Sequence, residues 1–267
     1  STISLVILLA LIYNLNLIPD TSLFNGRYKI DKLSTFMKLL TIGSGIFVMF
    51  TSSKYLQLNK INKIEYPILI LSSILGILVM ISSNDLIVFY MGLELQSLAL
   101  YVLASFNRNN LLSSESGLKY FVLSALSSGL LLYGCSLIYG FSESTNFNEI
   151  LNNSDQANYG LIFGLVFILV GLAFKISAVP FHMWAPDVYQ GSPTSVTMFF
   201  AVLPKIAALT VFIRILYVPF ANMIEQWQLI IVFLSIASMI FGAIAAIGQK
   251  NLKRLVAYSS IGHMGYA

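Results

Sequence analysis

The chain has 267 residues, of which 57% are hydrophobic and 10% are charged, and its formal net charge is +4. A soluble domain carries about a quarter charged residues, so this composition excludes a soluble globular protein. The few basic residues form no dense Lys/Arg patch, which excludes a nucleic-acid-binding protein.

Long apolar blocks predict an all-α fold, a polytopic transmembrane helical bundle. A helix needs about 20 apolar residues to cross the core of a bilayer. Eight blocks are predicted to be spans, at residues 2–18, 33–53, 66–82, 86–106, 114–140, 159–179, 194–217 and 227–248. A ninth span begins near Leu252 without finishing, so we expect a single integral membrane domain over residues 1–267 that is a fragment of something longer.

The charges of the connecting loops predict an orientation in the membrane. Loops on one side hold most of the basic residues: Lys54, Lys60, Lys63, Arg108, Lys250, Lys253 and Arg254. Loops on the other side hold Arg27, Lys29 and Lys32, followed by an acidic loop at residues 141–158 with Glu143, Glu149 and Asp155. Because basic loops are retained in the cytoplasm or the mitochondrial matrix, the first set is predicted to face that compartment.

Residues 180–193 do not fit a simple pattern of spans and loops. Three prolines and a glycine argue against a regular helix, yet Phe181, Met183, Trp184 and Tyr189 are poor residues for a solvated loop. Irregular backbone at membrane depth is tolerated where it is buried in protein or lines a polar cavity. The sequence leaves two interpretations open, a broken helix of this kind and an aromatic turn at the membrane interface.

Four charged residues lie inside the predicted spans: Glu94, Lys119, Lys175 and Lys205. A charge at the bilayer centre costs about 3 kcal/mol on insertion scales, so such residues are rarely accidental. Glu94 is near the middle of its span and must be protonated, paired or facing water. Lys119 lies nearer the start of its span, where a snorkelling side chain is the alternative to a functional one.

Buried lysines suit proton transfer because an apolar environment disfavours an ammonium ion, while a nearby carboxylate favours it. Movement of a carboxylate towards or away from such a lysine would switch it between holding and releasing a proton. Because imidazole side chains in general can exchange protons near neutral pH, His182 and His263 are candidate relays. The alternative for each histidine is a structural, hydrogen-bonded side chain.

Other kinds of chemistry lack the residues that they need. The sequence has no metal-ligand cluster, no CxxC pair and no phosphate-binding loop. The single cysteine, Cys135, cannot hold an iron–sulfur cluster. We therefore expect no cofactor or metal to be bound by this chain, and any linked redox reaction to occur elsewhere.

Four stretches carry a resemblance to a known family. Two are short, residues 92–98 (Gly-Leu-Glu-Leu-Gln-Ser-Leu) and 117–125 (Gly-Leu-Lys-Tyr-Phe-Val-Leu-Ser-Ala). Two are longer, residues 251–266 and residues 174–193, which begin with Phe174-Lys175, contain Pro-Phe-His-Met-Trp-Ala-Pro and end with Gly-Ser-Pro. Together they resemble the subunit N family of bacterial NADH:quinone oxidoreductase, called subunit 2 in mitochondrial complex I. The resemblance runs over nearly the whole chain from about Asp31.

This resemblance implies an antiporter-like, proton-translocating subunit in the membrane arm of complex I. By motif, Glu94 is paired with Lys175, Lys205 is the central carrier, Lys119 is a further charge on that axis, and His182 and His263 are possible relays. It also implies two inverted five-helix repeats. The first, residues 66–217, is complete here, and the second starts at 227–267 and is truncated.

The resemblance places the FMN, the iron–sulfur clusters and the NADH and quinone sites in other subunits. The expected partners are other membrane-arm subunits, especially neighbouring antiporter-like subunits and the small linking subunits, together with the lipid bilayer and no nucleic acid. A bacterial inner membrane and a mitochondrial inner membrane are both compatible. The alternative functions are a subunit of a multi-component cation/proton antiporter not linked to electron transfer, and a piece needed for assembly alone.

Overall fold

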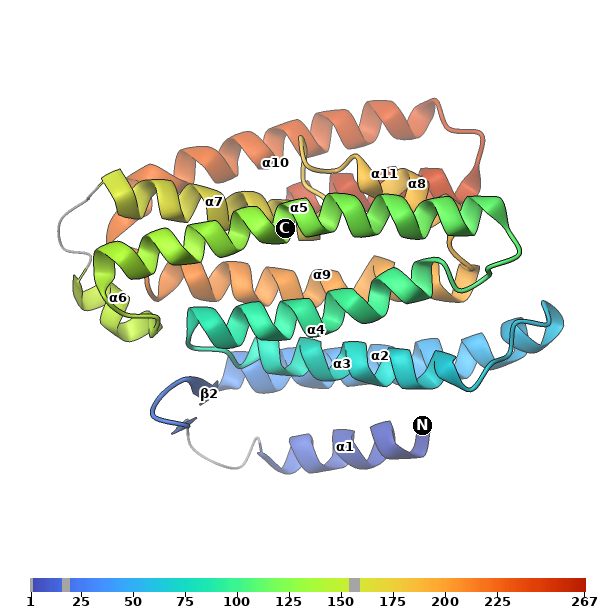
Figure 1. Cartoon of the computed structure of the whole chain (residues 1–267), viewed down its shortest axis with the longest axis horizontal. Coiled ribbons are helices and arrows are strands. Elements are labelled where there is room, and N and C mark those ends of the chain that lie inside the picture. The colour runs from blue at the N-terminus through green and yellow to red at the C-terminus, as the bar shows by residue number, and fades with distance from the viewer. Residues whose placement is uncertain (1, 16–19, 154–158) are drawn as a thin grey trace.

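The computed structural model describes residues 2–15, 20–153 and 159–267, and within these ranges the chain is a helical bundle with one small hairpin (Figure 1). Its elements are α1 (Thr2–Leu15), β1 (Thr21–Leu23), β2 (Tyr28–Ile30), α2 (Lys32–Leu58), α3 (Glu65–Ile81), α4 (Leu86–Ala104), α5 (Leu111–Ser142), α6 (Phe147–Asn153), α7 (Tyr159–Ile176), α8 (Trp184–Gly191), α9 (Thr194–Tyr217), η1 (Ala221–Met223), α10 (Ile224–Ile247) and α11 (Leu252–Tyr266). The predicted all-α transmembrane class is confirmed.

All eight predicted spans correspond to helices. Six helical segments in the described residues are long and apolar enough to cross a membrane, and α1 and α3 are shorter apolar helices. The ninth predicted span corresponds to α11, which begins at Leu252 as expected. The end of the first predicted span, residues 16–18, and Asp155 of the acidic loop lie outside the described residues.

Several short elements were not predicted, among them β1, β2, α6 and α8. The three-residue strands β1 and β2 pair antiparallel, with Thr21 opposite Ile30, and are too short for a periodic signal. The Asn- and Ser-rich loop contains α6, whose Phe147 and Ile150 are buried. The stretch predicted to be irregular contains α8, in which Pro186 is the third residue. Proline is tolerated there because the N–H groups of a first helical turn have no partner within the helix.

Small residues bring neighbouring helices close together. In α3 and α4, a Cβ added to Gly76 would lie 2.6 Å from the Gln96 backbone nitrogen and 2.7 Å from the Gly92 carbonyl oxygen. In α5 and α7, a Cβ on Gly134 would lie 2.8 Å from the Gly164 carbonyl oxygen. Such close backbone approach is typical of helix packing in membranes, where van der Waals contact replaces hydrophobic burial.

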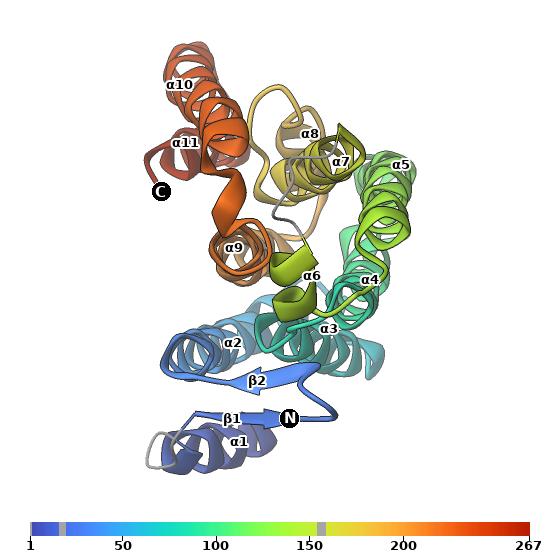
Figure 2. The same ribbon diagram turned by 90° about the vertical axis from the view of Figure 1, so that its left-hand side faces the viewer.

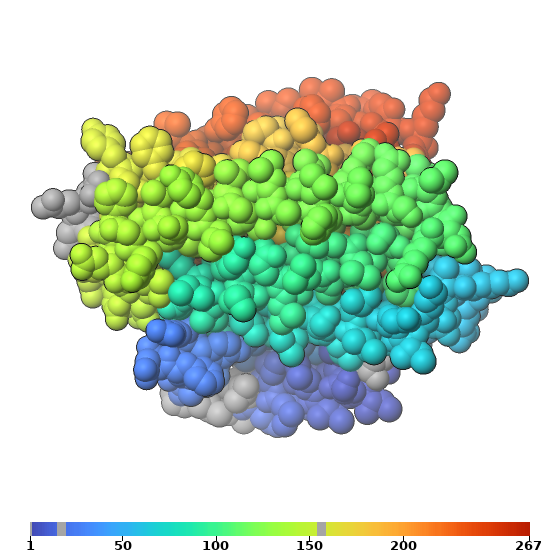
Figure 3. All heavy atoms as spheres, viewed as in Figure 1, coloured from blue at the N-terminus to red at the C-terminus, as the bar shows by residue number. Residues whose placement is uncertain are grey.

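Helix α9 occupies the interior of the bundle. It contacts α2, α3, α4, α7 and α8, and of the candidate spans it is the most buried (Figure 2). In contrast, α5 runs across the outside of one face (Figure 3). Most of its exposed large side chains are apolar, among them Leu118, Phe121, Leu126 and Leu132. These residues fit contact with lipid.

An ion pair joins the start of α2 to the end of α9. Asp31 caps α2 by accepting the Ser34 N–H at 2.8 Å, and Arg214 Nη2 donates to its two carboxylate oxygens at 2.9 and 3.0 Å. Burial opposes ionisation of Asp31, but the Ser34 hydrogen bond and the Arg214 charge outweigh it, so the pKa of Asp31 lies below its usual value. The pair fixes one end of the central helix.

Gly76→Ala is expected to destabilise the protein because the new methyl group meets backbone atoms of α4 that cannot move aside. Overpacking of this kind costs about 1–3 kcal/mol. The matched control is Gly43→Ala in α2, where a Cβ would have nothing within 4 Å. Thermal denaturation in detergent should show a lower midpoint for Gly76→Ala only. Equal midpoints for the two variants would contradict the packing of α3 on α4.

Candidate functional site

The ammonium group of Lys175 is held inside the bundle by two hydroxyl groups. Lys175 lies in the last turn of α7, and its residue is 7% exposed. Its Nζ donates to Ser97 Oγ of α4 at 2.7 Å and to Ser124 Oγ of α5 at 2.8 Å. Tyr101 also donates to Ser124 Oγ, at 2.8 Å. Three helices thus meet at one buried cation.

The break after α7 fixes the position of Lys175. Ser177 has a left-handed backbone with φ of 63°, which turns the chain out of the helix. The Phe174 carbonyl accepts from Trp184 Nε1 at 2.9 Å, and the Val179 N–H donates to Ser238 Oγ of α10 at 2.9 Å. The polar backbone of the break therefore has protein partners, as irregular backbone at membrane depth requires. Of the two interpretations of this stretch, the structure favours the broken helix.

Glu94 lies near Lys175 without bonding to it. It is half-buried, and it interacts electrostatically with Lys175. Within the described ranges the two side chains form no ion pair, and Glu94 Oε1 is buried without a hydrogen-bond partner. Ser97, one turn further along α4, accepts a hydrogen bond from the Lys175 ammonium instead. Direct pairing of Glu94 with Lys175 is therefore absent from this arrangement, and a switchable pair stays a prediction.

Lys205 forms a second buried cation site. It follows Pro204 inside α9 and is 4% exposed. Its Nζ donates to Ser260 Oγ of α11 at 2.8 Å and lies 5.8 Å from the centroid of the Tyr189 ring. Hydroxyl and aromatic partners stabilise the ammonium without neutralising it.

Stacked aromatic rings lie between the two lysine sites. Tyr120 stacks on Trp184 at 4.8 Å and contacts Phe200 edge-on at 5.4 Å. Phe200 stacks in turn on Tyr189, the ring beside Lys205, at 6.4 Å. The rings come from α5, α8 and α9, so α8 links the surroundings of both lysines.

Lys119 lies apart from the buried lysines. Its side chain is 42% exposed, and its Nζ is 2.8 Å from both Glu115 Oε1 and Asp187 Oδ2. Its pairing with two acids differs from the expected place on the buried axis, because its side chain lies on the partly exposed side of α5 that carries Glu115 and faces Asp187. A role for Lys119 in proton transfer stays a prediction.

The two histidines occupy different environments. His182 is 9% exposed, its ring lies 4.5 Å from that of Phe241, and its Nδ1 has no hydrogen-bond partner in the described part of the chain. His263 is exposed on α11, with its ring 6.1 Å from that of Tyr266. Their proposed role as relays also stays a prediction.

Sequence reasoning missed the residues that hold the lysines: Ser97, Tyr101, Ser124, Tyr189 and Ser260. One signal was available, since Glu94, Ser97 and Tyr101 are spaced to lie on one face of a helix. Serine is too common in this chain for the others to stand out. No group of three His, Cys, Asp or Glu side chains among the described residues could hold a metal ion.

The chain matches known proteins along most of its length. Residues 83–267 match the family described as NADH:quinone oxidoreductase/Mrp antiporter, TM. The chain is 75% identical over 264 residues to NADH-quinone oxidoreductase subunit N of Pelagibacter ubique, covering 99% of this chain and 56% of that protein. It therefore spans about half the length of the curated relatives that it matches.

Two solved structures share its architecture. A chain of respiratory complex I from Thermus thermophilus, with bound aureothin, aligns with a TM-score of 0.84 at 32% identity, covering 99% of this chain and 56% of that one. A chain of the Mrp complex from Dietzia sp. aligns with a TM-score of 0.87 at 22% identity, covering 99% and 52%, and shows likeness of fold alone. The chain is an integral, multi-pass membrane protein of the bacterial inner-membrane type.

Ser124→Ala is expected to destabilise the protein because the buried Lys175 ammonium and the Tyr101 hydroxyl both lose an acceptor. Hydrogen bonds to charged groups contribute about 1.5–3 kcal/mol. Ser127→Ala, one turn along the same helix, is the control, because its buried Oγ has no partner in the described residues. Denaturant titration in micelles measures the free energy of unfolding of both variants. If Ser127→Ala lowers the free energy of unfolding as much as Ser124→Ala does, the hydrogen bonds assigned to Ser124 are contradicted.

Proposed function

Because the chain belongs to the NADH:quinone oxidoreductase/Mrp antiporter transmembrane family, we propose that it is a proton-translocating subunit in the membrane arm of complex I. A 75% identical relative bears the name subunit N of NADH-quinone oxidoreductase, which supports this assignment. The observation that carries the proposal is the Lys175 ammonium, buried in a membrane bundle and bonded only to neutral hydroxyl groups among the described residues.

Lys175 carries the proton in this mechanism. Its neutral hydroxyl partners, Ser97 and Ser124, stabilise the ammonium less than a bonded carboxylate would. Glu94 is near enough to act on Lys175 electrostatically. Movement of its carboxylate towards Lys175 favours the charged lysine, and movement away favours release of the proton.

Lys205 is the next carrier along the membrane plane in this proposal. Its bond to Ser260 places it where α9 meets α11. Residues 66–217 form the first five-helix repeat, and residues 227–267 begin the inverted second one. Lys119, His182 and His263 supply charge and relay steps around this route.

The electron-transfer chemistry belongs to other subunits under this proposal. FMN, iron–sulfur clusters, NADH and quinone bind elsewhere in the complex, and this chain contributes proton translocation alone. Its partners are the neighbouring antiporter-like subunits and the small linking subunits of the membrane arm. The protein acts as part of an NADH:quinone oxidoreductase, a proton-translocating enzyme.

A cation/proton antiporter subunit without a link to electron transfer is the second candidate. The shared fold of the Mrp complex chain favours it, but that chain is only 22% identical. The two candidates differ in what copurifies with the full-length protein. Flavin, iron–sulfur centres and NADH oxidation accompany a complex I subunit, and their absence would favour the antiporter.

Lys175→Met in the intact complex is expected to lower proton pumping and NADH oxidation together, because a coupled redox reaction stalls when the proton route is blocked. Loss of a side chain that takes part in proton transfer lowers the rate about tenfold or more. Both rates are measured in proteoliposomes with NADH and a quinone. Lys54→Met, which removes an exposed lysine from α2, is the control. Normal pumping by Lys175→Met would refute the assigned role.

A further inference from the structure

Helix α8 is held at both of its ends by the first turn of α11. Arg254 forms an ion pair with Asp187 in the first turn of α8. The neighbouring Lys253 donates from Nζ to the Ser192 carbonyl, just past the end of α8, at 2.6 Å. Cations in the first turn of a helix oppose its dipole, so their presence calls for a specific partner. Here that partner is α8.

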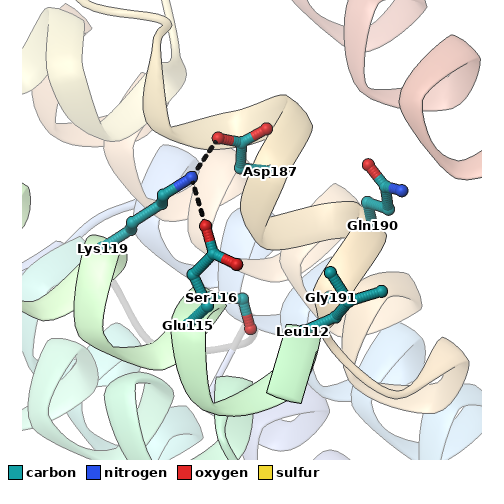
Figure 4. A pocket seen from close by; sticks show the side chains of 7 residues that line it. All are labelled: Leu112, Glu115, Ser116, Lys119, Asp187, Gln190 and Gly191. Atoms are coloured by element: carbon teal, nitrogen blue, oxygen red, sulfur yellow. Dashed lines mark hydrogen bonds and ion pairs between the residues drawn. The ribbon is translucent and has the colours of Figure 1, made fainter. Parts of the chain in front are cut away.

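Asp187 is also held from the opposite side by α5. Lys119 Nζ lies 2.8 Å from Asp187 Oδ2 and 2.8 Å from Glu115 Oε1, so it bridges the two acids (Figure 4). Asp187 is therefore shared by a lysine of α5 and an arginine of α11. Figure 4 shows Lys119 and Glu115 reaching from one helix towards Asp187 on the next.

The contact of α8 with α5 continues from this cluster towards Lys175. Trp184 lies one turn before Asp187 and stacks on Tyr120, the residue after Lys119. The same indole donates to the carbonyl of Phe174, which directly precedes Lys175.

On the α5 side of the contact, the neighbouring residues also reach Lys175. Tyr120 lies one turn before Ser124, which accepts from Lys175. The backbone on which Lys175 sits and the hydroxyl to which it bonds thus both depend on where α8 lies against α5. At the other end of α8, a Cβ added to Gly191 would lie 2.2 Å from the Leu112 carbonyl oxygen, so this contact is close along its length.

Stability alone does not explain the cluster. Asp187 and Lys119 are 33% and 42% exposed, and exposed ion pairs contribute little to folding. Their geometric effect is larger, because α8 is a helix of eight residues that follows an irregular segment, and Asp187 is the α8 residue whose ion pairs reach both α5 and α11.

We infer that Asp187 is a positioning residue for Lys175: shared by Lys119 and Arg254, it holds α8 against α5 and α11 and so sets the contacts of the Lys175 ammonium. The inference rests on the proposed function. It assigns to the first turn of α11 a role in the proton site of α7, since displacement of α11 displaces α8 and the Trp184–Phe174 bond with it.

The test compares Asp187→Asn, Asp187→Glu and the control Glu65→Gln in the intact complex, with Lys175→Met in parallel. Glu65 is an exposed acid in the first turn of α3. Pumping is recorded against pH in proteoliposomes supplied with NADH and quinone. Asp187→Asn should lower pumping about threefold or more, typical of residues that couple sites. Its pH profile should move by about half a unit, because Lys175 changes partners.

Asp187→Glu keeps the charge and should restore both the rate and the pH profile. Arg254→Gln added to Asp187→Asn should cause no further loss, because the two residues act through one contact. Rates are normalised to the amount of assembled complex, so poor assembly does not mimic the effect.

Two results would overturn the inference. One is an Asp187→Asn rate equal to that of Glu65→Gln, and the other is a lower rate with an unmoved pH profile, which indicates a structural role only. If Lys175→Met stalls pumping in the same experiment, either result rejects the positioning role alone. If Lys175→Met pumps normally, the proposed function itself fails.

Discussion

The polar backbone left free where α7 ends is the constraint on which the rest of the structure depends. In an apolar medium each unsatisfied N–H or carbonyl group costs several kcal/mol. The Trp184 indole satisfies the Phe174 carbonyl, and Ser238 accepts from the Val179 N–H. Because these partners belong to α8 and α10, the break in α7 forms only when both elements are packed against it. Lys175 is fixed in the interior as a consequence.

Close helix packing then determines which groups reach Lys175. The Gly134–Gly164 contact brings α5 against α7, and α4 packs on α5. A larger side chain at either glycine would meet atoms of the other helix and push the two helices apart. Ser97 and Ser124, each on a different helix, can therefore bond to one ammonium. The glycines thus affect the hydrogen bonds of Lys175 indirectly, because they set the distance between α5 and α7.

Hydropathy predicted the spans well because it sums a signal over about 20 residues. The environment of a single side chain cannot be predicted from such a sum. The sequence places Lys119 and Lys175 inside predicted spans, with Lys119 nearer the start of its own, but it does not give their partners. Lys119 is 42% exposed in its side chain and paired with acids, whereas Lys175 is buried among hydroxyls. The difference depends on where each helix crosses the bundle, which only the packing fixes. The serine partners and α8 were missed for the same reason, since their importance arises from contacts distant in sequence.

The hydroxyl partners of Lys175 bear on how a buried lysine can exchange its proton at all. A carboxylate bonded directly to an ammonium at low dielectric would hold it charged, since Coulomb energy grows as the dielectric constant falls. Two serines lower the cost of burying the charge but leave it uncompensated. In the proposed mechanism Glu94, which acts on Lys175 electrostatically and forms no ion pair with it among the described residues, controls this balance through its distance. Under that proposal a small displacement of either helix changes the distance, and the charge state of Lys175 follows the packing of the bundle.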